Sequence, residues 1–145
     1  MNSSTQKPPG AIRVLVLEDE PLVLMLIEAL LREFGYTDIC SAQNLGAARS
    51  ATDRALINVA LLDIRLPGGN SFEFAAELQE RGIPLIFASA GAASEIPERF
   101  SDAPLIDKPF DPNELRSALQ HVLRGAALTQ GLDLSSGRNT VALQF

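Results

Sequence analysis

Charged side chains follow three short apolar runs of this chain. They are Glu18 and Asp19 after the first run, Asp63 after the second, and Lys108 after the third. If these runs are parallel strands of one sheet, the four charges gather at the same edge of it. Carboxylates crowded at one place repel each other unless a divalent cation neutralises them. The pattern therefore predicts a cation site with a lysine beside it that binds an anionic group.

The chemistry that this group would support is metal-assisted phosphoryl transfer. Asp19 and Asp63 would each give an oxygen to Mg²⁺, which binds one or two carboxylates together with water and a phosphate, and Glu18 would reach the ion through water. Asp63 is also the candidate nucleophile. Its carboxylate can attack a phosphoryl group and form an aspartyl-phosphate, while the metal and Lys108 neutralise the phosphoryl oxygens.

Each of these residues alone also has an ordinary structural explanation, as a helix cap, a turn residue or a solvated charge. Counted along the whole chain, the apolar runs number five. The joint placement of polar residues after the first, third, fourth and fifth of them favours a site. The fourth run leads to Ser89, whose hydroxyl would add a hydrogen bond to a phosphoryl group, as would the backbone amides near Ala90.

The elements that must position these residues alternate short β-rich runs with longer helical patterns, which is typical of βα units and a parallel sheet. We predict strands over residues 12–17, 36–42, 56–62, 83–88 and 104–106, and helices within 21–35, 45–53, 70–82 and 111–125. Pro97 interrupts the segment 92–100, so we expect only a short or distorted helix there. The predicted fold class is α/β, with a doubly wound five-stranded parallel sheet.

The ends of two predicted helices depend on specific residues. Asn70 would cap the third helix, with Glu73 three residues further on, and Asp111 would cap the last helix, with a proline in its first turn. Gly125 would close that last helix, because glycine commonly follows a helix C-terminus.

Composition indicates one cytoplasmic domain. The chain has 145 residues, of which 46% are hydrophobic, and this is ample for a core. Its net charge of −6 argues against nucleic acid and anionic membranes as partners, and no segment approaches the ~20 apolar residues of a membrane span. Cys40 is the only cysteine, which excludes an internal disulfide and fits a reducing compartment.

We divide the chain into a polar, disordered tail over residues 1–10, one domain over 11–125, and an appendage over 126–145 that is too short for an output domain. Within the appendage, residues 140–145 could form a strand that pairs with a sheet edge, and a loose tail is the alternative. The segment 22–31 is more apolar than one buried stripe requires. Two explanations stay open: the protein forms a homodimer through this segment, or the segment is buried within one chain.

Four motifs together resemble the receiver domain of two-component response regulators, over about residues 11–125. They are VLVLEDEPLV (14–23), ALLDIRLPGG (60–69), PLIFASAGA (84–92) and LIDKPFDPNEL (105–115). The resemblance implies a flavodoxin-like fold with strand order 2-1-3-4-5, here as a stand-alone receiver. It also implies Mg²⁺-dependent phosphorylation by a histidine kinase or a histidine phosphotransfer protein, with output by protein contact or phosphate shuttling.

The resemblance also assigns roles to individual residues. The metal ligands and phosphoacceptor that it implies are Glu18, Asp19, Asp63 and the backbone carbonyl of Arg65, with Asp63 as phosphoacceptor. The phosphate-binding and switch residues that it implies are Ser89, Ala90, Lys108 and Pro109, with Pro109 after a cis peptide bond.

The sequence departs from the family pattern at three positions. Leu105 stands three residues before the lysine, where receivers often have an aromatic residue whose movement reports phosphorylation. Ser71 stands where a glycine commonly closes the loop after the phosphoacceptor, so Asn70 becomes a candidate for the left-handed conformation. Pro97 disturbs the face through which many receivers dimerise or contact output domains. The segment 87–91 resembles that of a stand-alone receiver subgroup with a Phe-Ala-Thr-Gly motif.

Two other functions stay open from the sequence. A phosphorylation-independent binding module would keep the acidic pocket without using it. A metal-dependent phosphohydrolase would also form an aspartyl-phosphate, but such enzymes usually carry a second aspartate two residues after the nucleophile, where this chain has Arg65. We therefore expect no enzyme activity beyond self-phosphorylation from a phosphodonor and autodephosphorylation.

Overall fold

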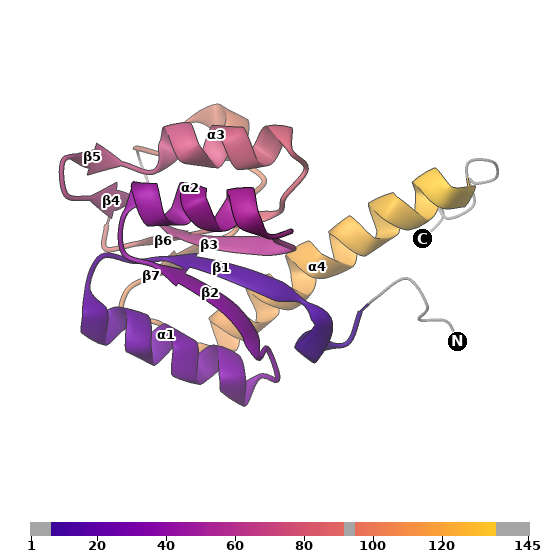
Figure 1. Cartoon of the computed structure of the whole chain (residues 1–145), viewed down its shortest axis with the longest axis horizontal. Helices are drawn as coiled ribbons and strands as arrows, with labels where there is room; N and C mark the ends of the chain where they lie inside the picture. The colour runs from indigo at the N-terminus through magenta and orange to yellow at the C-terminus, as the bar shows by residue number, and fades with distance from the viewer. Residues whose placement is uncertain (1–6, 92–94, 136–145) are drawn as a thin grey trace.

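Five parallel strands form the central sheet of the computed structural model, which describes residues 7–91 and 95–135, with side chains as far as residue 127. The strands are β1 (Arg13–Leu17), β2 (Asp38–Ala42), β3 (Val59–Asp63), β6 (Leu85–Ser89) and β7 (Leu105–Asp107). Their order is β2-β1-β3-β6-β7, which confirms the predicted order 2-1-3-4-5 (Figure 1). The strand predicted over residues 140–145 lies outside the described residues.

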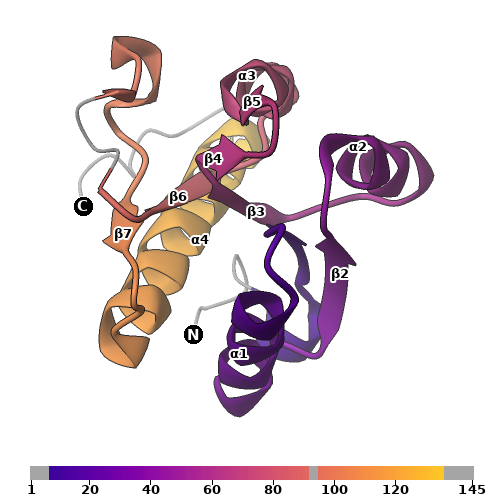
Figure 2. The same cartoon turned by 90° about the vertical axis from the view of Figure 1, so that its left-hand side faces the viewer.

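Helices cover both faces of this sheet. They are α1 (Pro21–Glu33), α2 (Leu45–Arg54), α3 (Phe72–Glu80) and α4 (Pro112–Ser135). Helices α2 and α3 lie on one face, and α1 and α4 lie on the other (Figure 2). The predicted doubly wound α/β architecture is therefore confirmed.

The two faces of β1 show why the sheet lies in the middle. Side chains alternate along a strand, so Leu15 and Leu17 belong to the core under α2 and α3, whereas Val14 and Val16 belong to the core under α1 and α4. All four side chains are buried. Because both faces are apolar, charged side chains reach this sheet only where the strands end.

Helix α1 buries one stripe and exposes another. It begins at Pro21, whose missing N–H and fixed φ suit a first helical position, and Gly35 after it has a φ of +99°. On its outer side, Leu22, Met25 and Leu26 are 80%, 61% and 47% exposed. Full burial of this apolar helix within one chain is therefore excluded, and the outer stripe faces solvent.

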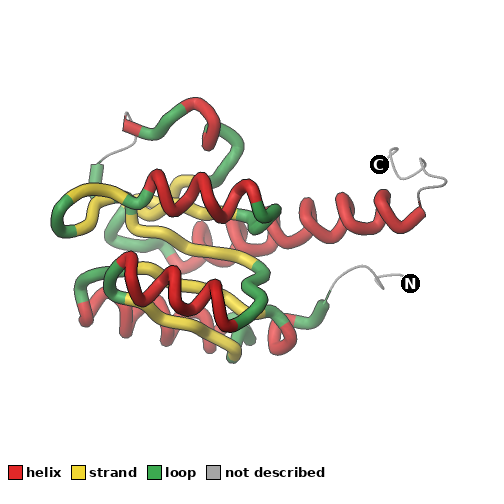
Figure 3. Tube along the Cα trace, turned by 45° about the horizontal axis from the view of Figure 1, so that its top comes forward, coloured by secondary structure: helices red, strands yellow, loops and turns green. Residues whose placement is uncertain are grey.

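The last helix is longer than the sequence predicts. It does not end at Gly125 but continues to Ser135 as part of α4. A glycine inside a helix costs only about 1 kcal/mol relative to alanine, and Ala126 and Ala127 directly after it are strong helix formers. Ala127 is also buried. As a result α4, which runs against the direction of the strands, overhangs the amino end of the sheet (Figure 3).

Pro97 prevents a regular helix between β6 and β7. Within the described part of this segment, Glu95 and the turn Glu98–Phe100 have 3₁₀ structure, and that turn starts directly after Pro97. The expected short or distorted helix thus takes the form of short 3₁₀ structure. Phe100 at its end is buried and anchors the turn to the core.

The loop after β3 is a small hairpin of β4 (Arg65–Leu66) and β5 (Gly69–Asn70). Pro67 followed by Gly68, with a φ of +88°, is the pattern of a type II turn. The prediction of a left-handed Asn70 is wrong, because Gly68 takes the positive φ instead. The cap position of α3 is Ser71 rather than Asn70, although the Asn70 side chain still accepts a hydrogen bond from the Phe72 amide at 3.0 Å.

Candidate functional site

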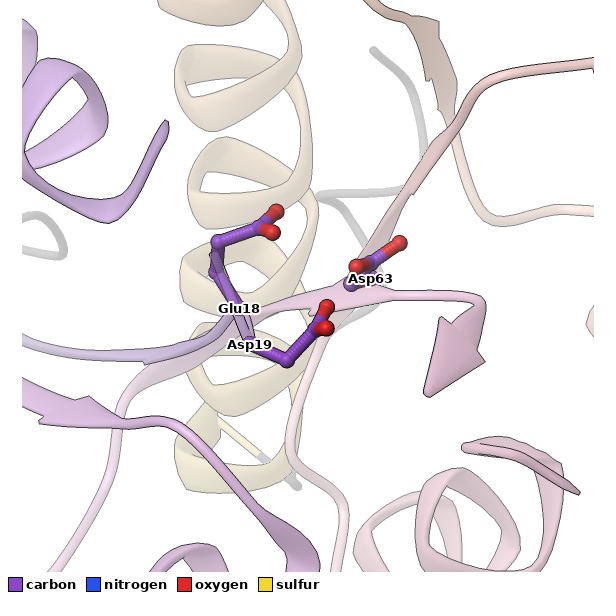
Figure 4. A group of neighbouring side chains, drawn as sticks. All are labelled: Glu18, Asp19 and Asp63. Atoms are coloured by element: carbon purple, nitrogen blue, oxygen red, sulfur yellow. The ribbon is translucent and has the colours of Figure 1, made fainter. Parts of the chain in front are cut away.

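Three carboxylates meet at the carboxyl end of the sheet. Strands β1 and β3 are neighbours, with Leu17 opposite Leu62, so the residues that follow them lie side by side. Glu18 and Asp19 come directly after β1, and Asp63 is the last residue of β3. One oxygen from each carboxylate lies within 4.8 Å of the others (Figure 4). Parallel pairing thus brings together residues that are 45 positions apart in the sequence.

Lys108, which directly follows β7, contacts two of these carboxylates. Its Nζ lies 2.7 Å from Oε1 of Glu18 and 3.2 Å from Oδ2 of Asp63. Glu18 is fully buried, and its second oxygen accepts a hydrogen bond from the amide of Glu20 at 3.1 Å. Asp63 is 6% exposed, whereas Asp19 is half-buried. The site is therefore a polar group surrounded by protein on most sides.

The charges of this group shift the pKa of Asp63 strongly. Burial first, and the neighbouring charge of Glu18 second, raise the pKa of Asp63 from its ordinary 3.8 to about 7, and the charge and hydrogen bond of Lys108 offset only part of this rise. Burial lowers the pKa of Lys108, but its hydrogen bond to Glu18 and the charge of Asp63 outweigh this, so that pKa lies above its usual value. The lysine stays charged, and Asp63 is poorly compensated.

The donor set fits a divalent cation. One ammonium faces three carboxylates, so the group carries a net charge of about −2 when all are ionised, and the charge of Glu18 adds to burial in raising the pKa of Asp63. Carboxylate oxygens are hard donors, which Mg²⁺ prefers. Because Asp19 is only half-buried, a bound Mg²⁺ could keep part of its water shell there. The residues present therefore fit the cation that the sequence predicts.

The other predicted site residues surround this group at the same end of the sheet. Ser89 ends β6 and is buried, and its carbonyl accepts a hydrogen bond from the Lys108 amide at 2.8 Å. Ala90 follows it and is exposed. The peptide bond between Lys108 and Pro109 is cis, as predicted. Arg65 lies two residues beyond Asp63, and its backbone carbonyl stays a predicted ligand.

Two contacts near the site were not foreseen from the sequence. Glu18 was expected to act on a metal through water, but in the structure it also holds Lys108, a residue 90 positions away. The exposed side chain of Arg65 forms an ion pair with Glu95, which lies in the loop after β6. No sequence spacing signals either pair, because the partners are 90 and 30 positions apart in the chain.

Three aromatic side chains pack close to Leu105, the position at which receivers often have an aromatic residue. Phe72, Phe87 and Phe100 pack against one another with ring centroids 5.3 to 6.0 Å apart. Leu105 packs against the same core and lies opposite Phe87 on the neighbouring strand. Phe87 is two residues before Ser89, so this aromatic cluster is linked directly to the site.

The sequence model of the response regulator receiver domain matches residues 14–120, which is most of the chain. This chain belongs to the receiver domain family. Receiver domains are signalling modules of two-component systems that bind Mg²⁺ at an acidic pocket. They interact with histidine kinases or phosphotransfer proteins and with effectors.

Related proteins include response regulators from several bacteria. The transcriptional regulatory protein AruR of Pseudomonas aeruginosa is 33% identical over 121 residues, covering 77% of this chain and 49% of AruR. The phyllosphere-induced regulator PhyR of Methylorubrum extorquens is 33% identical over 122 residues, covering 78% of this chain and 44% of PhyR. This receiver domain thus spans about half the length of the curated relatives it matches.

A solved structure of similar length is also available for comparison. The solution structure of SdrG from Sphingomonas melonis Fr1 is 31% identical and superposes with a TM-score of 0.67, covering 86% of this chain and 98% of SdrG. Within the described part of this receiver domain, no helix is long and apolar enough to cross a membrane.

Proposed function

We propose that this receiver domain accepts a phosphoryl group on Asp63 from a phosphohistidine of a partner protein, in a Mg²⁺-dependent reaction. The observation that carries the proposal is the group of Glu18, Asp19, Asp63 and Lys108. It places a nucleophilic carboxylate between oxygen ligands for a cation and an ammonium that can bind the transferred group.

The proposed step is a displacement at phosphorus. An oxygen of Asp63 attacks, the P–O bond to the aspartate forms, and the P–N bond to the donor histidine breaks. The Lys108 ammonium, 3.2 Å from Oδ2, turns from Asp63 to an oxygen of the transferred group. A bound Mg²⁺ would neutralise charge on the phosphoryl oxygens. The residues that would hold it are Asp19, Asp63 and the Arg65 carbonyl, with Glu18 beside them.

Residues at neighbouring strand ends would complete the binding of the phosphoryl group. Ser89 at the end of β6 and the amide of Ala90 would donate hydrogen bonds to it, and the change at Ser89 would pass to Phe87 and the aromatic cluster. Autodephosphorylation by water would return the domain to rest. Output would follow through contact with a downstream protein or through transfer of the phosphoryl group in a relay.

The partner would meet exposed apolar residues beside the site. Leu22, Met25 and Leu26 form the outer stripe of α1, and Leu22 lies three residues after Asp19. This stripe would form the docking surface for the phosphodonor. A second copy of this chain is the alternative occupant. Sedimentation at two protein concentrations, compared with Met25→Glu, distinguishes the two, because only a homodimer changes its mass with concentration and with this substitution.

The proposal is tested by treating the protein with acetyl phosphate and Mg²⁺ and measuring its intact mass. The wild type and Asp102→Asn, which alters an exposed carboxylate outside the site, should each gain one phosphoryl group. Asp63→Asn should gain none. Equal labelling of Asp63→Asn would overturn the assignment of the phosphoacceptor. No labelling of the wild type, beside a competent control receiver, would favour a phosphorylation-independent module, and sustained phosphomonoester turnover would favour a hydrolase.

A further inference from the structure

A cavity lies at the opposite end of the sheet from Asp63. It has a volume of about 470 Å³, which is within the range of small-molecule sites. Its walls are the turn before β1, the loops before β3 and β6, and α4. None of the residues that line it belongs to the acidic group, so it is a separate feature of the fold.

The overhang of α4 builds one wall of this cavity. Ala126 and Ala127, which line it, belong to the part of the helix beyond Gly125. If the helix ended at Gly125, as the sequence predicts, this end of the sheet would be open. Ala127 is buried, and it lines the cavity together with the loops at the amino end of the sheet.

The charged side chains that line the cavity are all positive. Lys7, Arg81 and Arg124 line it and are exposed, and no aspartate or glutamate is among the described residues of its wall. This is unusual in a chain of net charge −6. The guanidinium of Arg81 is also held in place, because it donates a hydrogen bond to the Thr52 carbonyl at 3.0 Å. The rim therefore favours an anion.

The inner wall of the cavity is apolar. Ile12, Ile57 and Ile83 are buried there, and Tyr36 is 4% exposed with a phenol whose pKa is raised by burial. Leu56 also lines the cavity but is 72% exposed, which is uncommon for a leucine next to a concave apolar surface. A ligand with an apolar body would cover Leu56 and release water from this wall.

We propose that this cavity binds a small amphipathic anion, an aliphatic or aromatic carboxylate, with its apolar part against the isoleucines. Its carboxylate lies at the rim with Arg81 and Arg124. The site is independent of Asp63, so ligand binding does not require phosphorylation, and the failure of one proposal leaves the other standing.

The test uses the full chain, labelled with ¹⁵N, and follows amide chemical shifts during titration with decanoate. Saturable shifts are expected at Asn58, Gly82 and Leu123, around the cavity. Decylamine, which has the same chain and the opposite charge, should produce none of them. The double variant Arg81→Glu/Arg124→Glu should weaken decanoate binding by about tenfold or more. The control Arg32→Glu/Arg54→Glu reverses two exposed charges elsewhere and should bind as the wild type does.

A second variant tests the shape of the cavity. Ala126→Trp would fill the space beside α4, so it should abolish the shifts while the spectrum outside the cavity stays that of the folded protein. The proposal is overturned if decanoate shifts only residues of the exposed α1 stripe, if decylamine binds equally well, or if the wild type shows no saturable shifts. Unchanged binding in both cavity variants would also overturn it.

Discussion

Lys108 and Glu18 form a buried ion pair in which Nζ lies 2.7 Å from Oε1. The side chains are 16% and 1% exposed, so solvent screens this pair weakly. The same ammonium is 3.2 Å from Asp63, a longer contact than the one to Glu18. Glu18 therefore positions the lysine, in addition to contributing an oxygen to the acidic group.

Removing the lysine should destabilise the metal-free protein. Lys108→Met leaves the fully buried Glu18 without its cation, and breaking a buried pair in this way costs about 3 kcal/mol. Glu18→Gln should cost less, because Lys108 keeps Asp63 as a partner. The free energy of unfolding is measured by urea denaturation in EDTA. In the double variant Lys108→Met/Glu18→Gln, the loss should be smaller than the sum of the single losses, and strict additivity would contradict the pairing.

The stability of the metal-free protein should depend on the ionisation of Asp63. Because the folded state raises its pKa from 3.8 to about 7, the folded state binds a proton more tightly than the unfolded state does. The contribution of Asp63 to stability is therefore fully present below about pH 4 and is lost as pH rises to about 7. Above that pH the ionised carboxylate opposes folding.

The measurement for this prediction is the difference in unfolding free energy between Asp63→Asn and the wild type, in EDTA, from pH 4.5 to pH 8. Asparagine cannot ionise, so the unfolding free energy of the variant should rise relative to that of the wild type by about 3 kcal/mol between pH 4.5 and pH 8. Comparison at each pH cancels the titration of the other carboxylates. A difference that stays constant over this range would show that Asp63 ionises normally.

Mg²⁺ should stabilise the wild type through the acidic group. At a Mg²⁺ concentration ten times its Kd, the gain is about 1.4 kcal/mol, seen as a higher Tm in calorimetry. Asp19→Asn removes one of the proposed ligands and should lose most of this gain. Glu20→Gln alters the exposed neighbour outside the carboxylate group and should keep it. If Asp19→Asn responds to Mg²⁺ as the wild type does, Asp19 is not a ligand.

The 3₁₀ turn should depend on Phe100 for its attachment to the core. Phe100 is 2% exposed and contacts the rings of Phe72 and Phe87, so Phe100→Ala should destabilise the protein by about 3 kcal/mol. Leu22→Ala, at a side chain that is 80% exposed, serves as the control and should change stability by less than about 0.5 kcal/mol. Urea denaturation of both variants gives the comparison. Similar losses would mean that the aromatic cluster is loosely packed.

The predictable part of this protein is the part that depends on local pattern. Alternation of strands and helices predicted a parallel sheet, and the strand ends predicted where Asp63 and Lys108 lie, whereas the strand order came from the family resemblance. Gly125 could not be assigned from the sequence, because a glycine ends a helix or continues it according to what packs after it. The Lys108–Glu18 pair could not be predicted either, since its geometry depends on the register of four adjacent strands, β1, β3, β6 and β7.

The loop after Asp63 gives a similar lesson. Asn70 and Gly68 can both adopt a positive φ, and the sequence alone offered Asn70 because Ser71 replaces a glycine. In the structure the turn forms two residues earlier, where Pro67 fixes the first turn position. Turn chemistry, rather than the family pattern, therefore decides the conformation of this loop.

The four charged residues of the site follow strands that differ in how many neighbouring strands they pair with. Strands β1 and β3, which carry the carboxylates, each lie between two neighbours, whereas β7, which leads to Lys108, has three residues and a single neighbour at the sheet edge. Local opening should therefore begin at β7, and its backbone amides should exchange with solvent deuterium sooner than those of β3. The strands that carry the carboxylates should therefore stay rigid, whereas the strand that leads to Lys108 can move when a partner binds.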